Sequence, residues 1–376
     1  MSDARLENLS ESEAAMRSYL QRIATGPELS KDISLEEARH GMQLILDGRA
    51  DSVQAGVFLI ALRMKRESDD ETRGILQAIR EATIRVEAAI DEVLEMADPY
   101  DGFNRTLPAS PFLPAVLAAC GVPAYAHGVQ SMGPKFGATH HQVLRAAGIA
   151  VDETPEELAS RLADPAIAWG YIDQSRFCPK LYNLSDLRRL IVKRPAITTT
   201  EVLAGPVKGR KATHLVTGFV HKPYPRIYAL LARHAGYQSA LIVRGTEGGI
   251  IPSLRQSGKI WHYHDGGEEK EVDIEPIALD IHQQLRAVPL PDHLPGYRKK
   301  IDDVATNVDG DAIAAEAARA GVQALEGKRG ATFDALIYGA ALCLWHLGRR
   351  PSLPEAANAA RKVLASGQAL KHFKAG

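Results

Sequence analysis

The chain has 376 residues, of which 45% are hydrophobic and 24% charged, and its 45 Lys and Arg nearly balance its 46 Asp and Glu. This length is enough for two domains, and the composition is that of an ordinary soluble globular protein. A net charge of −1 excludes a global field that would draw the whole chain to nucleic acid or to a membrane, so such a partner would need a local patch.

No segment of the sequence predicts export or membrane insertion. The N-terminal stretch MSDARLENLSESEAAMRSYL is polar and acidic, unlike a signal or transit peptide. The longest apolar run, Leu336 to Trp345, is far too short to cross a bilayer. The three cysteines are scattered without CxxC spacing, which argues against a disulfide framework and a structural zinc site. We therefore expect a cytoplasmic protein with no membrane partner.

The N-terminal quarter reads as helical from residue 11 to about residue 97. Two capping boxes, Ser34 with Glu37 and Ser68 with Glu71, mark helix starts. Three helices are expected there, at residues 35–46, 53–66 and 69–89. The second has apolar residues on more than one face, and this surplus would be buried either in a homodimer or against the other domain. We predict a helical dimerisation domain over residues 1–97, joined by helices from about 178–195.

From residue 98 onward, short strands alternate with helical patterns. Strands are expected at 124–126, 167–172, 214–220 and 239–243, and helices at 155–162, 184–193 and 225–234, followed by 311–325, 332–347 and 353–366. Such alternation predicts a mainly parallel sheet with helices on both faces. The predicted fold class is therefore α/β, with a small N-terminal all-helical domain and a larger α/β domain made of residues 98–177 and 196–376.

Two glycine-punctuated loops, at residues 101–106 and 127–139, each precede a helical pattern. Free backbone N–H groups at such places suit phosphate or another anion, although turn geometry alone also explains the glycines. Because ligands of parallel sheets bind at the carboxyl ends of strands, these loops and the one at Gly245 are expected to meet. The candidate pocket residues are Asp101, Gly102, Asn104, Arg105, Thr106, His127, Gly128, Lys135, Gly137 and Thr139.

The stretch from Arg188 to Arg233 contains ten basic residues and a single acid, Glu201. Basic clusters bind the phosphates of nucleotides or nucleic acids, and they also occur as plain solvated surface. The candidate polyanion-binding residues are Lys193, Arg194, Lys208, Arg210, Lys211, Lys222 and Arg226.

Several segments, spread over nearly the whole chain, resemble the anthranilate phosphoribosyltransferase family, which belongs with the pyrimidine nucleoside phosphorylases. They are SLEEARHGMQLILDG, the two loops within 98–148, Phe177-Cys178-Pro179, the Arg189 to Pro206 segment, Val243-Arg244-Gly245 and SLPEAANAARKVLASGQAL. The resemblance implies a homodimer joined through its helical domains. It also implies magnesium-assisted transfer of ribose phosphate from an activated diphosphate to an aromatic amine, with Arg189 in the place of the arginine that holds the aromatic carboxylate.

The motifs that carry the chemistry depart from the family pattern. The diphosphate loop GTGGD corresponds to residues 100–104, and KHGNR corresponds to residues 126–130, where the lysine and arginine are missing. Ile251 and Pro252 stand in place of the acidic magnesium pair and cannot coordinate a cation, which leaves Glu247 as one replacement acid. We therefore expect no cofactor, with Mg²⁺ required only if the chain is an active transferase.

The leading hypothesis is a homodimer with degenerate diphosphate and magnesium motifs that binds nucleic acid or another polyanion non-specifically, because such paralogues exist in the family it resembles. One alternative is an active phosphoribosyltransferase with a different acceptor, using Asp101, His127 and Glu247. Another is a structural or regulatory dimer that binds only a stray anion. His262 and His264 would share one face of a strand, but two ligands make a weak zinc site, so no metal site is predicted.

Overall fold

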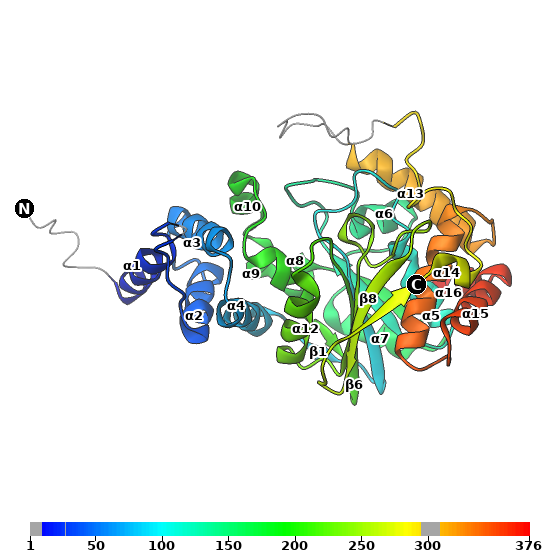
Figure 1. The fold of residues 1–376 in the computed structure, drawn as a ribbon, viewed down its shortest axis with the longest axis horizontal. Helices are drawn as coiled ribbons and strands as arrows, with labels where there is room; N and C mark the ends of the chain where they lie inside the picture. Colours follow the sequence, from blue (N-terminus) through cyan, green and yellow to red (C-terminus); the bar gives the residue numbers. More distant parts are fainter. Residues whose placement is uncertain (1–9, 27, 295–308) are drawn as a thin grey trace, which may run out of the picture. The chain divides into compact units, whose positions relative to one another are not determined.

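The computed structural model describes residues 10–26, 28–294 and 309–376. The chain divides into two compact units (Figure 1). The helical unit comprises Met1–Ile84 and Cys178–Ala204, and the α/β unit comprises Arg85–Phe177 and Gly205–Gly376. Among the described residues, no helix has the length and apolar character needed to cross a membrane.

The helical unit is built from two separate stretches of the chain. The first forms α1 (Glu11–Ile23), α2 (Leu35–Leu46), α3 (Ser52–Lys65) and α4 (Asp69–Ala82), and the second forms α9 (Pro179–Tyr182), α10 (Ser185–Ile191), α11 (Ile197–Thr200) and η3 (Glu201–Leu203). Both predicted capping boxes are present, at Ser34 and Ser68. The core contains the fully buried Met16, Phe58 and Ile75. These helices enclose one small hydrophobic core of their own.

The α/β unit contains a seven-stranded sheet in the order β4-β3-β2-β6-β7-β8-β9. Its strands are β2 (Glu92–Ala97), β3 (Ala124–Gly128), β4 (Trp169–Asp173), β6 (Ala212–Gly218), β7 (Ser239–Val243), β8 (Gly258–His264) and β9 (Lys270–Ile274). The first five strands in the sheet order are parallel, while β8 and β9 are antiparallel to their neighbours. The predicted α/β fold with a mainly parallel sheet is confirmed. A separate pair, β1 (Val86–Glu87) with β5 (Val207–Lys208), is also parallel.

Helices cover the sheet, with α12 on the left of the strands in Figure 1 and α5 and α14 to α16 on the right. The helical segments of this unit are η2 (Ser110–Phe112), α5 (Leu113–Ala119), α6 (His140–Ala146), α7 (Pro155–Ala163), α8 (Gln174–Phe177), α12 (Tyr224–His234), η4 (Thr246–Gly248), η5 (Pro276–Leu279), α13 (Gly310–Leu325), α14 (Ala331–His346), α15 (Leu353–Ala365) and α16 (Gln368–Ala375). The longest apolar run of the sequence lies in α14, which is buried along most of its length. The interior of this unit therefore forms around α14, α5 and the central strands.

Residues 85–97 differ from the sequence expectation. The sequence pattern places them in the helical domain, with a helix reaching residue 89, but α4 ends at Ala82 and the segment forms β1 and β2 of the α/β unit. The charges at Glu92 and Glu95 have a helix-like spacing, and Glu95 is fully buried in the centre of a strand, where a sequence pattern predicts an apolar residue. The strands β8 and β9 were not predicted.

Candidate functional site

Three loops meet at the carboxyl edge of the sheet, after β2, β3 and β7. The loop after β2 pairs with the loop after β3, since the Phe103 N–H donates to the Ala138 carbonyl at 3.0 Å and the Ala138 N–H donates to the Phe103 carbonyl at 2.8 Å. Gly102 has φ +72°, and a Cβ there would lie 2.5 Å from the Gly137 carbonyl oxygen. A Cβ on Gly137 would lie 2.5 Å from the Phe103 carbonyl oxygen. Both glycines are therefore needed for this close backbone contact.

The third loop contributes a carboxylate that occupies the backbone donors of the first. Glu247 Oε2 accepts from the Asn104 N–H at 3.2 Å, and Oε1 accepts from the Arg105 N–H at 3.0 Å and from the Thr106 hydroxyl at 2.9 Å. The Glu247 backbone is in the left-handed region, at φ 55°. These are the donors from which the sequence predicted an anion site, and in the structure they bind an anion that belongs to the chain itself.

Lys135 lies beside this carboxylate and joins the loops. Its Nζ donates to the Gly102 carbonyl at 2.7 Å and lies 3.4 Å from Asp101 Oδ1 and 3.8 Å from Glu247 Oε2. Its side chain is 17% exposed, while those of Asp101 and Glu247 are 5% and 7% exposed. Lys135 therefore offsets two buried carboxylates rather than presenting its charge mainly to a ligand.

Two further predicted residues, Thr139 and Gly128, lie at the ends of secondary-structure elements. The Thr139 hydroxyl accepts from the Gln142 N–H and closes a capping box at the start of α6. Gly128 is the last residue of β3, and a Cβ there would lie 3.3 Å from the Tyr171 hydroxyl. These positions explain the residue types without a ligand.

A buried network around Asp98 was missed in the sequence. Asp98 Oδ1 accepts from the Ile250 N–H at 2.8 Å, while Oδ2 accepts from Ser110 Oγ and contacts His140 Nε2 at 2.7 Å. One carboxylate thus joins the end of β2, the start of α6 and the loop after β7. Its signal in the sequence was an acid directly after a strand, and this signal was lost because β2 was read as helix.

His127 is held in the interior of the α/β unit. Its side chain is 0% exposed, and its two ring nitrogens lie 2.5 Å from the Tyr100 hydroxyl and 3.0 Å from Glu95 Oε1. The Tyr125 hydroxyl also donates to Glu95, at 2.6 Å. Burial alone would raise the pKa of the Glu95 carboxyl, but the hydrogen bond and charge of His127, with the Tyr125 hydroxyl, hold that pKa below its ordinary value. Both ring nitrogens of His127 thus have partners within the chain, and its role as an acid or base stays a prediction.

Ile251 and Pro252, which the resemblance places where the family has its magnesium pair, lie in apolar surroundings. Pro252 is buried, and Ile251 packs against the hydrophobic core while its carbonyl accepts from the Thr246 N–H at 3.0 Å. Both residues also line a small cavity of about 30 Å³ with Phe103 and Leu254. Neither side chain offers the oxygen atoms that Mg²⁺ requires.

The basic segment is divided between the two units and between two edges of the sheet. Lys208, Arg210 and Lys211 lie at the amino ends of β2 and β6, where the Arg210 N–H bonds to the Ile90 carbonyl and Lys211 pairs with Asp91 at 2.8 Å. Lys222 and Arg226 follow the carboxyl end of β6 and are exposed. Lys208, Arg210 and Lys211 therefore lie at the edge of the sheet opposite the three loops, and their part in polyanion binding stays a prediction.

Arg189, Lys193 and Arg194 belong to the helical unit, where all three are exposed. Arg189 lies on α10, with its guanidinium 3.4 Å from Asp186. Its neighbour Arg188 is buried and makes two hydrogen bonds to Glu201, at 2.6 and 2.7 Å. Arg188 is thus a structural residue of the helical unit, while Arg189 remains available to solvent.

Both parts of the chain match models of known protein domains. Residues 17–83 match the helical bundle domain of a glycosyl transferase family, and residues 101–288 match the a/b domain of a glycosyl transferase family. An anthranilate phosphoribosyltransferase from Thermomicrobium roseum is 28% identical over 361 residues, covering 95% of this chain and 94% of that protein. An uncharacterized protein from Aquifex aeolicus is 30% identical over 225 residues, covering 59% of this chain and 65% of that protein.

Solved structures share the fold over nearly the whole chain. The anthranilate phosphoribosyltransferase of Thermus thermophilus has a TM-score of 0.72 at 20% identity, covering 96% of this chain and 97% of that one. The enzyme of Saccharomyces cerevisiae in complex with PRPP and Mg has a TM-score of 0.73 at 16% identity, covering 96% of each chain. At these identities the likeness establishes the fold.

Proposed function

The chain belongs to glycosyltransferase family 3, and we propose that within this family it binds nucleic acid through the phosphate backbone instead of catalysing magnesium-dependent transfer of ribose phosphate. The observation that carries the proposal is the Glu247 carboxylate, which occupies the N–H groups of Asn104 and Arg105. A diphosphate bound at these donors would have to displace a carboxylate held by three hydrogen bonds. Ile251 and Pro252 supply no metal ligand that would repay this cost.

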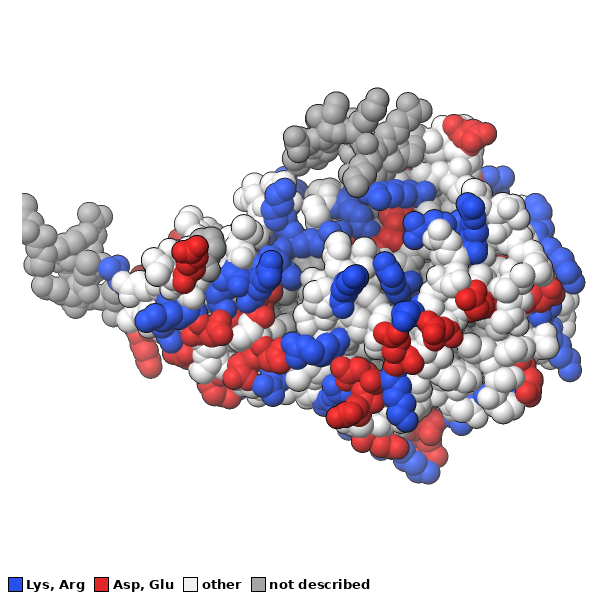
Figure 2. Space-filling view, viewed as in Figure 1, with Lys and Arg blue, Asp and Glu red and all other residues white. Residues whose placement is uncertain are grey.

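Charge on the carboxyl edge of the sheet supports binding of an extended polyanion. Arg105, Lys222, Arg226 and Arg244 are exposed and lie in or just after the loops that follow β2, β6 and β7. On the face shown in Figure 2, Lys and Arg predominate along the edge of the α/β unit near α6, while Asp and Glu gather toward β1. Basic side chains arranged in this way neutralise successive phosphates and confer affinity without base specificity.

We also propose that the helical unit forms the homodimer interface. Val53, Val57 and Met64 on α3 lie within about 40° of one another around the helix axis at 100° per residue, and they are 71%, 37% and 75% exposed. Leu190 on α10, a helix that packs beside α3, is 73% exposed. An apolar stripe of this kind on a helix is typical of a surface that binds a second copy.

Anisotropy titration of labelled single-stranded DNA tests nucleic-acid binding. Four phosphate contacts on a single strand predict that affinity falls about 50-fold between about 50 and 200 mM salt. The variant Lys222→Ala/Arg226→Ala/Arg244→Ala should bind more weakly and lower the salt slope by about 2. The matched control Lys208→Ala/Arg210→Ala/Lys211→Ala removes the same charge from the opposite edge and should bind like the parent.

Two results would overturn this proposal. One is DNA binding that is absent at about 50 mM salt or does not change with salt. The other is a control variant that weakens binding as much as the carboxyl-edge variant does. Calorimetry with the activated ribose diphosphate and Mg²⁺ should show no heat of binding, whereas saturable heat would favour the alternative of an active transferase.

A further inference from the structure

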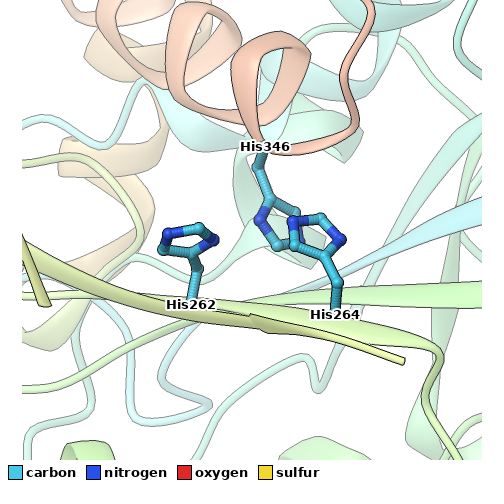
Figure 3. Close-up of side chains that lie close together, drawn as sticks. All are labelled: His262, His264 and His346. Carbon is cyan, nitrogen blue, oxygen red and sulfur yellow. The ribbon is translucent and has the colours of Figure 1, made fainter. Parts of the chain in front are cut away.

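Three histidines from two distant parts of the α/β unit meet at the edge of the sheet opposite the three loops. His262 and His264 lie two residues apart on β8 and point to the same face, and His346, the last residue of α14, points toward them (Figure 3). One ring nitrogen from each lies within 4.8 Å of the others. Because His264 pairs with Ser239, the first residue of β7, the cluster lies at the amino edge of the parallel strands.

Two of these rings hold buried nitrogens that have no hydrogen-bond partner. The Nδ1 atoms of His262 and His346 are both in this state. Leaving a buried polar atom unsatisfied costs about 1–3 kcal/mol, and a bound ion is one recognised reason for tolerating it. Packing alone is the competing explanation, since His264 stacks on His346 with ring centroids 4.5 Å apart and His262 packs on Trp345 at 5.0 Å. Packing leaves both nitrogens unexplained, whereas a metal ion would use them.

The Nε2 atom of His346 has a hydrogen-bond partner, so its Nδ1 atom is the one that can bind a metal ion. Its Nε2 lies 2.8 Å from Ser239 Oγ, and the same hydroxyl lies 2.8 Å from His214 Nδ1. A hydroxyl has one proton, so it can donate to His214 while accepting from the N–H of His346. This arrangement leaves Nδ1 of His346 unprotonated, and outer partners of this kind orient the histidine ligands of metal ions. His214 extends this series of side-chain contacts to Glu92, whose Oε2 lies 3.9 Å from His214 Nε2.

One side of the histidine cluster is open to a cavity. The cluster borders a cavity of about 430 Å³ that is also lined by Glu92, His214 and Arg349. A fourth ligand could therefore enter from the cavity as water or as a small anion.

We propose that His262, His264 and His346 bind a Zn²⁺ ion, with water from the adjoining cavity as the fourth ligand. Zinc accepts imidazole nitrogens in tetrahedral geometry, in which neighbouring nitrogens lie about 3.3 Å apart. The three rings must therefore close by an ångström or more, and the exposed His264 side chain can supply much of this movement by rotating about its χ angles.

Calorimetric titration of the chelator-treated full-length protein with ZnCl₂ tests the site. We expect one ion per chain, and MgCl₂ should give no binding. His264→Gln changes an exposed side chain and should weaken Zn²⁺ binding at least 100-fold without loss of fold. The matched control His282→Gln alters another exposed histidine, which pairs with Asp280 at 3.0 Å, and should bind like the parent.

The variant Ser239→Ala distinguishes a metal site from simple packing of the histidine rings. It removes the partner of His346 Nε2 but no proposed ligand, so it should weaken Zn²⁺ binding about 10- to 100-fold with unchanged stoichiometry. The proposal is overturned if the parent binds no Zn²⁺, or if His264→Gln and His262→Gln both bind it like the parent. Circular dichroism of each metal-free variant ensures that lost binding reflects a lost ligand.

Discussion

Glu247 shows how one side chain can change the use of a backbone site. Its carboxylate accepts from two backbone N–H groups and one hydroxyl, and Lys135 lies 3.8 Å away. Glu247→Ala should therefore destabilise the α/β unit by about 1.5–3 kcal/mol, because bonds to a charged acceptor are lost. The same change exposes the amide donors, so the variant should bind inorganic pyrophosphate more tightly than the parent.

Urea unfolding and thermal melting with and without pyrophosphate measure both effects. Glu268→Ala, which removes an exposed acid from the same unit, is the matched control and should change neither quantity. If the Glu247 variant is as stable as the parent and pyrophosphate stabilises it no further, the carboxylate does not occupy an anion site.

Residue-level prediction succeeded where a backbone constraint decides the residue type. Gly102 and Gly137 were identified as loop residues, and their close backbone contact explains why both are glycine. Glu247 was identified as a replacement acid, but its partners lie more than a hundred residues away in sequence, so spacing did not predict that it fills the donors itself. His346, the third proposed zinc ligand, was not singled out because nothing near it in the sequence marks a ligand.

The packing of α2 against α4 depends on a glycine within a helix. A Cβ on Gly74 would clash with the Leu35 carbonyl oxygen and lie 2.9 Å from the Arg39 backbone nitrogen. Backbone atoms cannot move aside as a side-chain tip can, so Gly74→Ala should destabilise the helical unit by about 1–3 kcal/mol despite the better helix propensity of alanine.

Gly56 on α3 is the matched control for Gly74. A Cβ there meets only Leu187 Cδ1, at 3.7 Å, which is ordinary van der Waals contact. Gly56→Ala should therefore stabilise the unit by up to about 1 kcal/mol. Thermal unfolding followed by circular dichroism at 222 nm compares the two variants, and equal effects of the same sign would show that the contact at Gly74 is not limiting.

Elements were predictable where local pattern and final environment agree. The capping boxes placed the starts of α2 and α4, and the apolar runs placed β3 and β7. β2 was misread because it buries Glu95 between Tyr125 and His127, a tertiary arrangement with no trace in the local pattern. β8 was not among the predicted strands, although His262 and His264 alternate with Trp261 and Tyr263 as in a half-buried strand.

At the scale of the whole molecule, sequence proximity was a poor guide to charge clustering. Residues 188–233 form one basic run in the sequence, yet they are divided between the helical unit and the two edges of the sheet. Parallel strands cause this division, since a chain that enters a strand at one edge leaves it at the other. Arg244 lies outside the run but follows β7, so it joins Lys222 at the carboxyl edge.

The apolar stripe on α3 makes the oligomeric state testable. Val53 and Met64 are more than 70% exposed in the chain on its own, and a homodimer through this stripe would bury both. Val53→Glu/Met64→Glu would place two unpaired carboxylates in that interface at a cost of several kcal/mol, enough to separate the subunits at micromolar concentration. Light scattering should give twice 40.8 kDa for the parent and 40.8 kDa for the variant. Ile277→Glu, at a 66% exposed isoleucine of the α/β unit, should remain dimeric. If the double variant is still dimeric, the interface does not lie on this stripe. If the parent is monomeric, the proposed homodimer is wrong.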